Sequence, residues 1–361
     1  MRIAVIIGTR PEAVKMAPVH RALVQAGFDS KLVSTGQHLE LLASALRPLE
    51  LEPDRELAIM TPDQTPNAVA SRILDRMPAV LADLQPAAVL VQGDTTSAMA
   101  TALTAYHLRI PVGHVEAGLR TYDDDNPFPE EANRQLIARV ARCSFAPTEL
   151  ARRQLLTEHV DPGRVFVTGN TAVDSLLWMI ARRPAAPARK PYLLLTLHRR
   201  ESFGDPLRGI LGAVADLLAQ VPEAEVLWPV HPNPHVMSLA TECLGDHPRV
   251  ALCPPLSYDA FATALADARA VLSDSGGVQE EAPSLGKKVL IARDTTERPE
   301  AIASGHNRLV GRDRARIREA LLAAWQAPPY TGPLPAANPY GDGHAGARIA
   351  AILADELRLG T

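Results

Sequence analysis

The sequence has few cysteines, no excess of positive charge and no long hydrophobic run. Its three cysteines, Cys143, Cys243 and Cys253, are far apart and form no CxxC pair, which argues against a disulfide framework and a zinc site. A net charge of −4 and a pI near 6.3 leave no basic footprint for nucleic acid. No apolar segment is long enough to span a membrane, and the N-terminus enters a strand-like segment rather than a signal peptide. We therefore expect a cytoplasmic protein that binds neither nucleic acid nor membrane.

What the sequence does contain is a regular alternation of strand-like and helical segments. Strands are predicted at residues 3–7, 31–34, 87–91, 111–115 and 165–168, and helices at 12–25, from 37, at 66–84, 96–107, 129–142 and up to 178. Strands alternating with helices at this spacing predict an α/β fold with parallel sheets covered by helices on both faces. The 361 residues are enough for two domains with complete cores.

The segment RRPAAPARKP at 182–191 is the expected domain boundary, because it is rich in proline and charge. We expect an N-terminal Rossmann-like domain over 1–181 and a second over 192–343, in which a new alternation starts with a strand at 192–197. Residues 344–357 have the pattern of an amphipathic helix. Two doubly wound domains that face a cleft would bind a ligand at the C-terminal ends of their strands.

The stretch from 271 to 301 contains the most informative motif of the second domain. A short apolar strand is followed by the bend Ser273–Gly277, and a helical pattern then runs from Val278 to a glycine cap at Gly286. Backbone N–H groups at such a turn bind anions, phosphate above all. The motif therefore predicts a nucleoside-diphosphate site, whereas the turn alone would indicate only a helix cap. The expected contacts are the turn residues Ser275, Gly276 and Gly277, with Glu281 at the ribose and Arg298 on the diphosphate.

Carboxylates follow three predicted strands of the first domain. Asp94 lies in QGDTTSA, Glu116 in HVEAGLRT and Glu130 in PFPEEANR, with Arg134 one helical turn after Glu130. Individually, an Asp before a helix is most often an N-cap, and first-turn acids complement the helix dipole. Together at one sheet edge, mutual repulsion and burial would raise the pKa of at least one of them. That arrangement is typical of general acid–base catalysis.

Basic residues at the other strand ends are candidates for phosphate contacts or proton transfer. Arg10 and Lys15 in GTRPEAVKMAP lie at a helix start, where they could meet phosphate or remain solvated surface charges. The segment lacks the G-x-G-x-x-G spacing, so no nicotinamide cofactor is expected. His198 in TLHRRESFG follows the first strand of the second domain and is followed by two arginines, a pattern that favours a functional histidine over a structural one.

Two further motifs of the second domain are ambiguous. In PVHPNPHV, His231 and His235 have a metal-like spacing, but two prolines prevent the helical geometry of a metal pair, and we expect no metal. Phe261 in PLSYDAFATAL could form an apolar wall for a uracil ring, or could be an ordinary core position of an amphipathic helix.

Taken together, these motifs resemble the non-hydrolysing UDP-N-acetylglucosamine 2-epimerases. The match is nearly unbroken from Ser273 to Glu300 and extends over almost the whole chain, from Gly8 to Tyr340. The resemblance implies a GT-B fold in which the last helix, 344–361, packs back on the first domain. It also implies a homodimer without a cofactor, which binds UDP-N-acetylglucosamine (UDP-GlcNAc) and UDP and supplies precursors of cell-surface polysaccharide.

The family interconverts UDP-GlcNAc and UDP-N-acetylmannosamine (UDP-ManNAc) at C2 of the sugar. The C2 proton is not adjacent to a carbonyl, so the family's chemistry expels UDP from C1 while C2 loses its proton, and UDP then adds back to 2-acetamidoglucal. The residues that match the family's catalytic positions are Asp94, Glu116, Glu130, Arg134 and His198. Those that match its UDP site are Arg10, Lys15, Phe261, Ser275, Gly276, Gly277, Glu281 and Arg298.

Three other functions remain open at this stage. A GT-B glycosyltransferase would share the fold and the diphosphate turn, although it would not need the three carboxylates together. A hydrolysing 2-epimerase would admit water to the glycal and release UDP. A nucleotide-sugar sensor would bind without turnover, against which the intact candidate catalytic residues argue.

The resemblance also implies regulation, because many bacterial members require a second UDP-GlcNAc for turnover. Among the matching positions, Gln37, Arg199 and His231 keep their residue type, whereas Glu40 replaces a glutamine and Asp63 an arginine. Two acidic groups beside a diphosphate would weaken the second site by like-charge repulsion. We therefore expect weak or absent activation, the alternative being a site that persists through Arg199 and the backbone.

Overall fold

Two compact units make up the chain in the computed structural model, which describes residues 1–36, 42, 45–61, 64–183, 190–199 and 204–359. The first unit comprises Met1–Ser175 and Tyr340–Thr361, and the second comprises Leu176–Pro339. The division falls inside helix α7 (Thr171–Arg182), upstream of the segment 182–191 expected as the boundary, and residues 184–189 of that segment lie outside the described ranges.

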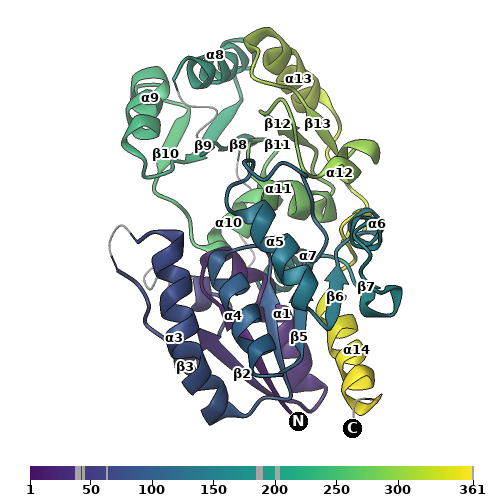
Figure 1. The fold of residues 1–361 in the computed structure, drawn as a ribbon. Helices are drawn as coiled ribbons and strands as arrows, with labels where there is room; N and C mark the ends of the chain where they lie inside the picture. The colour runs from purple at the N-terminus through teal and green to yellow at the C-terminus, as the bar shows by residue number, and fades with distance from the viewer. Residues whose placement is uncertain (37–41, 43–44, 62–63, 184–189, 200–203, 360–361) are drawn as a thin grey trace. The chain divides into compact units, whose positions relative to one another are not determined.

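The first unit contains a seven-stranded parallel sheet in the order β3-β2-β1-β4-β5-β6-β7 (Figure 1). The strands are β1 Arg2–Ile7, β2 Asp29–Ser34, β3 Arg55–Glu56, β4 Ala88–Gln92, β5 Val112–Val115, β6 Cys143–Ala146 and β7 Val165–Val167. The order reverses between β1 and β4. In a doubly wound sheet, the loops after the two strands at this switch point diverge and leave room for a ligand.

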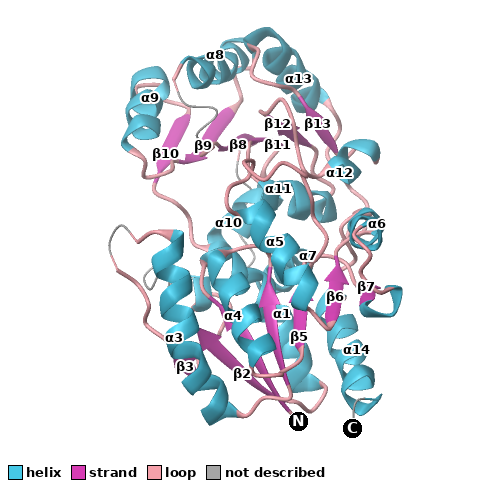
Figure 2. Cartoon of the chain, viewed as in Figure 1, coloured by secondary structure: helices cyan, strands magenta, loops and turns pink. Residues whose placement is uncertain are grey.

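Helices cover both faces of this sheet, as the alternation along β1 shows. Ile3, Val5 and Ile7 belong to a core cluster with residues of α1 (Arg10–Gln25) and α14 (Ala345–Leu359), and Ala4 and Ile6 to a second cluster with residues of α3 (Pro66–Leu84) and α4 (Thr96–His107). Figure 2 shows these helices alongside the sheet. In the part of this unit that the structure describes, the further elements include α5 Glu130–Val140, α6 Glu149–Thr157 and the 3-10 turn Pro162–Arg164. Burial on both faces explains the nearly continuous apolar runs of β1 and β4.

The returning C-terminal segment is fastened to the first unit at the start of α14. Pro18 interrupts the hydrogen bonding of α1 because it has no N–H for the Val14 carbonyl, and the Ser175 hydroxyl donates to that carbonyl instead, at 2.5 Å. The neighbouring Asp174 carboxylate accepts the backbone N–H of Gly346 at 2.8 Å, in the first turn of α14. The start of α7 therefore contacts both α1 and the first turn of α14.

The second unit repeats the same architecture with a six-stranded parallel sheet in the order β10-β9-β8-β11-β12-β13, which reverses between β8 and β11. Its strands are β8 Tyr192–Thr196, β9 Glu225–Pro229, β10 Val250–Cys253, β11 Ala270–Ser273, β12 Val289–Ile291 and β13 Asn307–Leu309. Its helices are α8 Asp205–Gln220, α9 Pro234–Leu244, α10 Tyr258–Asp267, α11 Gly276–Glu281, α12 Pro299–Ala303 and α13 Arg314–Gln326, with a 3-10 segment at Ala282–Leu285. Trp228, fully buried, lies in the core between this sheet and its helices.

The structure confirms the predicted α/β class with two doubly wound domains and corrects several element bounds. Strand β6 and helix α6 were not predicted, and α5 ends at Val140 because Ala141 turns into extended backbone. Helix α7 continues to Arg182 rather than ending near Trp178, and α11 begins at Gly276 rather than Val278. The glycine cap is confirmed, since Gly286 has a positive φ of 65°. Within the described ranges, no helix has the length and apolarity needed to cross a membrane.

Candidate active site

A buried carboxylate joins the two loops at the switch point of the first unit. Glu12, in the first turn of α1, accepts the backbone N–H groups of Gly8 and Thr9 at 2.8 and 2.6 Å, which closes a capping box. Its other oxygen accepts the Thr95 hydroxyl at 2.7 Å. Burial raises the pKa of Glu12, and these hydrogen bonds offset only part of that effect. The loop after β1 and the loop after β4 are thus held together beside Asp94.

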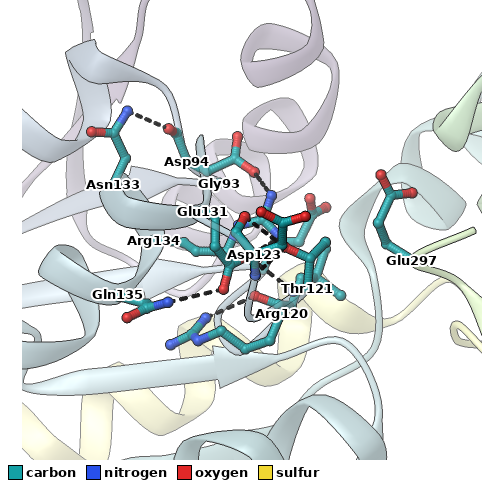
Figure 3. Close-up of polar contacts among 12 residues, drawn as sticks. Gly93, Asp94, Arg120, Thr121, Asp123, Glu131, Asn133, Arg134, Gln135 and Glu297 are labelled. Atoms are coloured by element: carbon teal, nitrogen blue, oxygen red, sulfur yellow. Dashed lines mark hydrogen bonds and ion pairs between the residues drawn. The ribbon is translucent and has the colours of Figure 1, made fainter. Parts of the chain in front are cut away.

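Asp94 is oriented by Arg134 rather than by the helix that follows it. Thr95, not Asp94, is the N-cap of α4, because its hydroxyl accepts the Ala98 N–H at 3.0 Å. The Asp94 carboxylate instead pairs with the Arg134 guanidinium at 2.7 Å, and Asn133 donates to the Asp94 carbonyl at 2.9 Å (Figure 3). The interpretation of Asp94 as an ordinary N-cap is therefore wrong, and its side chain remains 29% exposed beside Arg134.

Glu131, the neighbour of the candidate Glu130, holds the loop before α5. Its fully buried carboxylate lies 3.4 Å from Arg134 and accepts the backbone N–H groups of Thr121 and Tyr122 at 3.0 and 3.2 Å (Figure 3). Burial by itself raises the pKa of Glu131, but the hydrogen bonds and the positive charge of Arg134 outweigh it and lower the pKa. Arg134 is thus fixed between two carboxylates, one partly exposed and one structural.

Glu116 lies at the end of β5 in left-handed backbone, with a φ of 63°. Its carboxylate forms an ion pair with Lys15 of α1, and the two side chains are 7% and 11% exposed. Asn170 also donates to this carboxylate, at 3.2 Å. A non-glycine residue in this conformation is uncommon and is concentrated at functional sites. The structure therefore brings together two of the candidates, Lys15 and Glu116, and adds Asn170.

The other two candidates of the first unit, Glu130 and Arg10, lie at the starts of helices. Glu130 is half-buried in the first turn of α5, and Arg10 is exposed at the start of α1. Neither contacts another candidate within the described ranges. Buried His114 holds the loop that carries Asp94, because its Nε2–H donates to the Gly93 carbonyl at 2.7 Å. Burial lowers the pKa of His114 to about 4, so it is neutral at physiological pH.

In the second unit, His198 is bound by a carboxylate that sequence reasoning did not single out. Asp274 follows β11, its side chain is fully buried, and its Oδ1 lies 3.0 Å from His198 Nδ1. It also accepts the backbone N–H groups of His198 and Arg199. His231 stacks on His198 with ring centroids 6.2 Å apart. The only indication in the sequence was the position of Asp274 directly after a strand at the switch point.

Arg298 lies against the glycine turn of the second unit. A Cβ atom on Gly276 would lie 2.7 Å from the Arg298 guanidinium carbon, so any larger residue there would displace the guanidinium. The guanidinium donates to Glu280 at 2.6 Å and lies 3.3 Å from Glu297. Burial raises the pKa of Glu297, but the charges of Arg298 and Arg293 outweigh it and bring the pKa to about 2. The arginine is therefore held by two carboxylates, Glu280 and Glu297, beside the turn Ser275–Gly277.

The expected nucleoside contacts lie nearby in the same unit. Glu281 is buried and accepts the Tyr258 hydroxyl at 2.8 Å. Burial and the charge of Glu281 raise the pKa of Tyr258 well above its usual value, so Tyr258 remains a donor. Phe261 lies one turn further along α10 and is half-buried, whereas Ala262 and Leu265 of this helix belong to the core.

His231 and His235 are both exposed, and the described ranges contain no group of three His, Cys, Asp or Glu side chains placed to hold a metal ion.

Of the positions considered for a second ligand, Arg199 is half-buried in the loop after β8, one residue beyond His198. Gln37, Glu40 and Asp63 lie outside the described residues.

Two Rossmann-like units of the same strand order, each with charged groups at its switch point, define a protein of the GT-B class. A solved kitacinnamycin glycosyltransferase superposes with a TM-score of 0.65 at 14% identity, which shows a shared fold alone. The family model of UDP-N-acetylglucosamine 2-epimerase matches residues 21–354, and the chain belongs to that family.

Individual relatives agree with this assignment. The chain is 44% identical to the UDP-N-acetylglucosamine 2-epimerase of Escherichia coli strain K12 over 97% of both chains. It is 41% identical to that of Bacillus subtilis strain 168, over 97% of this chain and 94% of the relative. The crystal structure of the Neisseria meningitidis epimerase bound to UDP-GlcNAc superposes with a TM-score of 0.89 at 38% identity, covering 98% of this chain and all of that one.

Proposed function

We propose that this protein interconverts UDP-GlcNAc and UDP-ManNAc by eliminating and re-adding UDP, without net hydrolysis. In the first step a base takes the C2 proton while the C1–O bond breaks, and its electron pair leaves with UDP. In the second step an oxygen of UDP attacks C1 of 2-acetamidoglucal, and a proton is delivered to the opposite face of C2. The reaction needs proton-transfer groups and a firm hold on the leaving diphosphate.

The residues fit these two requirements separately in the two units. In the first unit, Asp94 beside Arg134 and Glu116 beside Lys15 are oriented carboxylates that can take up or deliver protons, with Glu130 as the third candidate. In the second unit, the backbone of the Ser275–Gly277 turn and Arg298 would bind the diphosphate, and Glu281 and Phe261 the nucleoside. The observation that carries the proposal is the packing of Arg298 on Gly276, because a guanidinium beside a glycine turn at a strand end is an arrangement that suits a diphosphate.

The test is to incubate the protein with UDP-GlcNAc in D2O and to follow the products by NMR. We expect UDP-ManNAc with deuterium at C2, and deuterium in the recovered UDP-GlcNAc, because a proton lost to the base exchanges with solvent. Free N-acetylmannosamine with UDP would identify a hydrolysing epimerase instead. Turnover only after addition of an acceptor would identify a glycosyltransferase, and binding without any turnover a sensor.

We further propose that the protein acts as a homodimer in the cytoplasm, in the supply of precursors for cell-surface polysaccharide. UDP-GlcNAc and UDP are the ligands that we propose for this chain, because the similar Methanocaldococcus jannaschii UDP-GlcNAc 2-epimerase has been solved in complex with both, at 32% identity and a TM-score of 0.81 over 98% of this chain and all of that one. Light scattering at micromolar concentration tests the dimer, and a monomer mass would contradict it.

A further inference from the structure

We propose that Asp274 is the positioning residue of His198: it holds the imidazole in the tautomer with hydrogen on Nδ1, so that Nε2 is the atom that exchanges a proton during the reaction. This inference rests on the proposed function and adds a residue to it. Asp274 would not touch the sugar nucleotide, and its effect would reach the substrate through His198.

The contacts of Asp274 fix the direction of each hydrogen bond. Its carboxylate accepts the backbone N–H of Arg199 at 2.9 Å and that of His198 at 3.0 Å, and its Oδ1 lies 3.0 Å from His198 Nδ1. An ionised carboxylate can only accept hydrogen bonds. The hydrogen must therefore be on Nδ1, and in the neutral ring Nε2 carries the lone pair.

The sheet explains why these two residues meet. His198 and Asp274 each follow one of the two strands at the switch point, β8 and β11, where Thr196 pairs with Ser273. The backbone N–H of Asp274 continues this pairing by donating to the Thr196 carbonyl at 3.1 Å. The carboxylate therefore enters between two loops that diverge just beyond it. In such a sheet this is the position at which ligands bind.

The burial of Asp274 indicates that its negative charge does more than join two loops by hydrogen bonds. The Asp274 side chain is fully buried, and a buried carboxylate destabilises the fold unless hydrogen-bond donors surround it. Two backbone N–H groups alone could be satisfied by the neutral oxygen of an asparagine. The third contact, to the imidazole, is the one that a neutral side chain could not reproduce in the same tautomer.

The other groups that face His198 do not replace this contact. His231 stacks on the ring with an interplanar angle of 23°, and Arg199 is the next residue in the chain. In the part of the chain that the structure describes, Asp274 is the carboxylate that contacts His198. The His198 side chain remains 39% exposed, so the ring is accessible from the side away from Asp274.

Asp274→Asn reverses the tautomer while preserving shape. The amide oxygen can accept the two backbone N–H groups, and the NH2 group then faces Nδ1, which must become an acceptor. Histidine 15N chemical shifts of the free protein report this directly, with the His198 signal assigned by its loss in His198→Gln. We expect hydrogen on Nδ1 in the wild type and on Nε2 in Asp274→Asn. We also expect kcat to fall by roughly 10²-fold or more with KM and UDP affinity nearly unchanged.

Two controls separate positioning from a general structural role. Asp216→Asn makes the same chemical change at an Asp on α8 that pairs with Arg314, and it should leave tautomer and turnover unchanged. Adding Asp274→Asn to His198→Gln should cost no more than about twofold further, because residues that act through one another are not additive.

Three results would overturn the proposal: hydrogen on Nε2 of His198 in the wild type, normal turnover of Asp274→Asn, or lost UDP affinity with an unchanged tautomer. If Asp274→Asn does not fold, the wild-type spectrum still decides. If the wild type does not epimerise UDP-GlcNAc, the proposed function fails by itself. The two tautomer measurements need no substrate and still test the contact between Asp274 and His198.

Discussion

Arg134 shows how one cation can orient an accessible carboxylate. Its guanidinium lies 2.7 Å from Asp94 and 3.4 Å from Glu131, and its side chain is 7% exposed. Glu131 is fully buried and committed to the loop N–H groups, whereas the Asp94 side chain is 29% exposed. A fixed cation between a structural and an accessible carboxylate orients the accessible one at little entropic cost, since Arg134 is already immobilised.

The candidate carboxylates can be tested one at a time by removing their charge. We expect Asp94→Asn, Glu116→Gln and Glu130→Gln each to reduce turnover by roughly 10²-fold or more, because each change removes a proton-transfer group. UDP affinity, measured by calorimetry, should change much less. Glu149→Gln is the matched control, because Glu149 is also a first-turn acid but pairs with Arg152 on the surface of α6. Near-normal rates in all three variants would disprove the assignment.

Arg298 should be sensitive even to a change that keeps its charge. Lysine cannot contact Glu280 and a diphosphate at once as the planar guanidinium can, so Arg298→Lys should weaken UDP binding by about tenfold or more. Arg308→Lys is the control, because Arg308 is an exposed residue on β13. Isothermal titration with UDP decides the matter, and unchanged affinity would remove Arg298 from the site.

At the scale of elements, apolar periodicity predicted most strands and helices but not the short ones. The bounds of α3 and α4 were predicted as the structure has them, since each begins after a capping threonine. Strand β6, Cys143–Ala146, was missed because it has only four residues, one of them a buried serine. Its burial depends on neighbouring strands that are distant in the sequence, and no local pattern reports that.

The Asp174 carboxyl, at the junction between α7 and α14, should make the free energy of unfolding depend on pH. Burial raises the pKa of Asp174 from 3.8 to about 6, against the effect of its hydrogen bonds from Gly346 and Ala345. Because the folded-state pKa is the higher one, this stabilisation is complete below about pH 3.8 and is lost as pH rises through about 6. The whole change corresponds to about 3 kcal/mol.

Comparison of Asp174→Asn with the wild type isolates this contribution. Asparagine does not ionise, so its unfolding midpoint relative to the wild type should rise between pH 4.5 and pH 7.5. Asp161→Asn, which removes an exposed capping carboxylate, should run parallel to the wild type over this range. Calorimetric melts provide the measurement. If all three profiles run parallel, the Asp174 carboxyl does not titrate in this range.

At the scale of the whole molecule, the sequence located the candidate residues but not their partners. Asp94, Glu116 and His198 all follow strands, so their positions at sheet edges could be predicted from the alternation. Lys15 with Glu116 and His198 with Asp274 are separated by 101 and 76 residues, and only the folded sheets bring them together. The strongest contacts of the site are therefore those that sequence spacing could not reveal.

At the same scale, we predict that activation by a second molecule of UDP-GlcNAc is weak in this protein. In the resemblance to regulated epimerases, the contacts for a second UDP-GlcNAc include Arg199 and His231, and His231 stacks directly on His198. A second ligand at these residues would thus contact the candidate catalytic ring. Glu40 and Asp63, however, place two acidic groups where regulated members have an amide and a cation. Each should disfavour a diphosphate by about 1 kcal/mol or more through like-charge repulsion.

UDP-ManNAc as the sole substrate tests this prediction, because it contains no activator. We expect conversion without a lag and no acceleration when a trace of UDP-GlcNAc is added. The double variant Glu40→Gln, Asp63→Arg restores the residue types of regulated members, and it should gain a lag that UDP-GlcNAc abolishes. A wild-type protein that stays inactive on UDP-ManNAc until UDP-GlcNAc is supplied would contradict the prediction, since the second site would then persist through Arg199, His231 and the backbone despite both acidic groups.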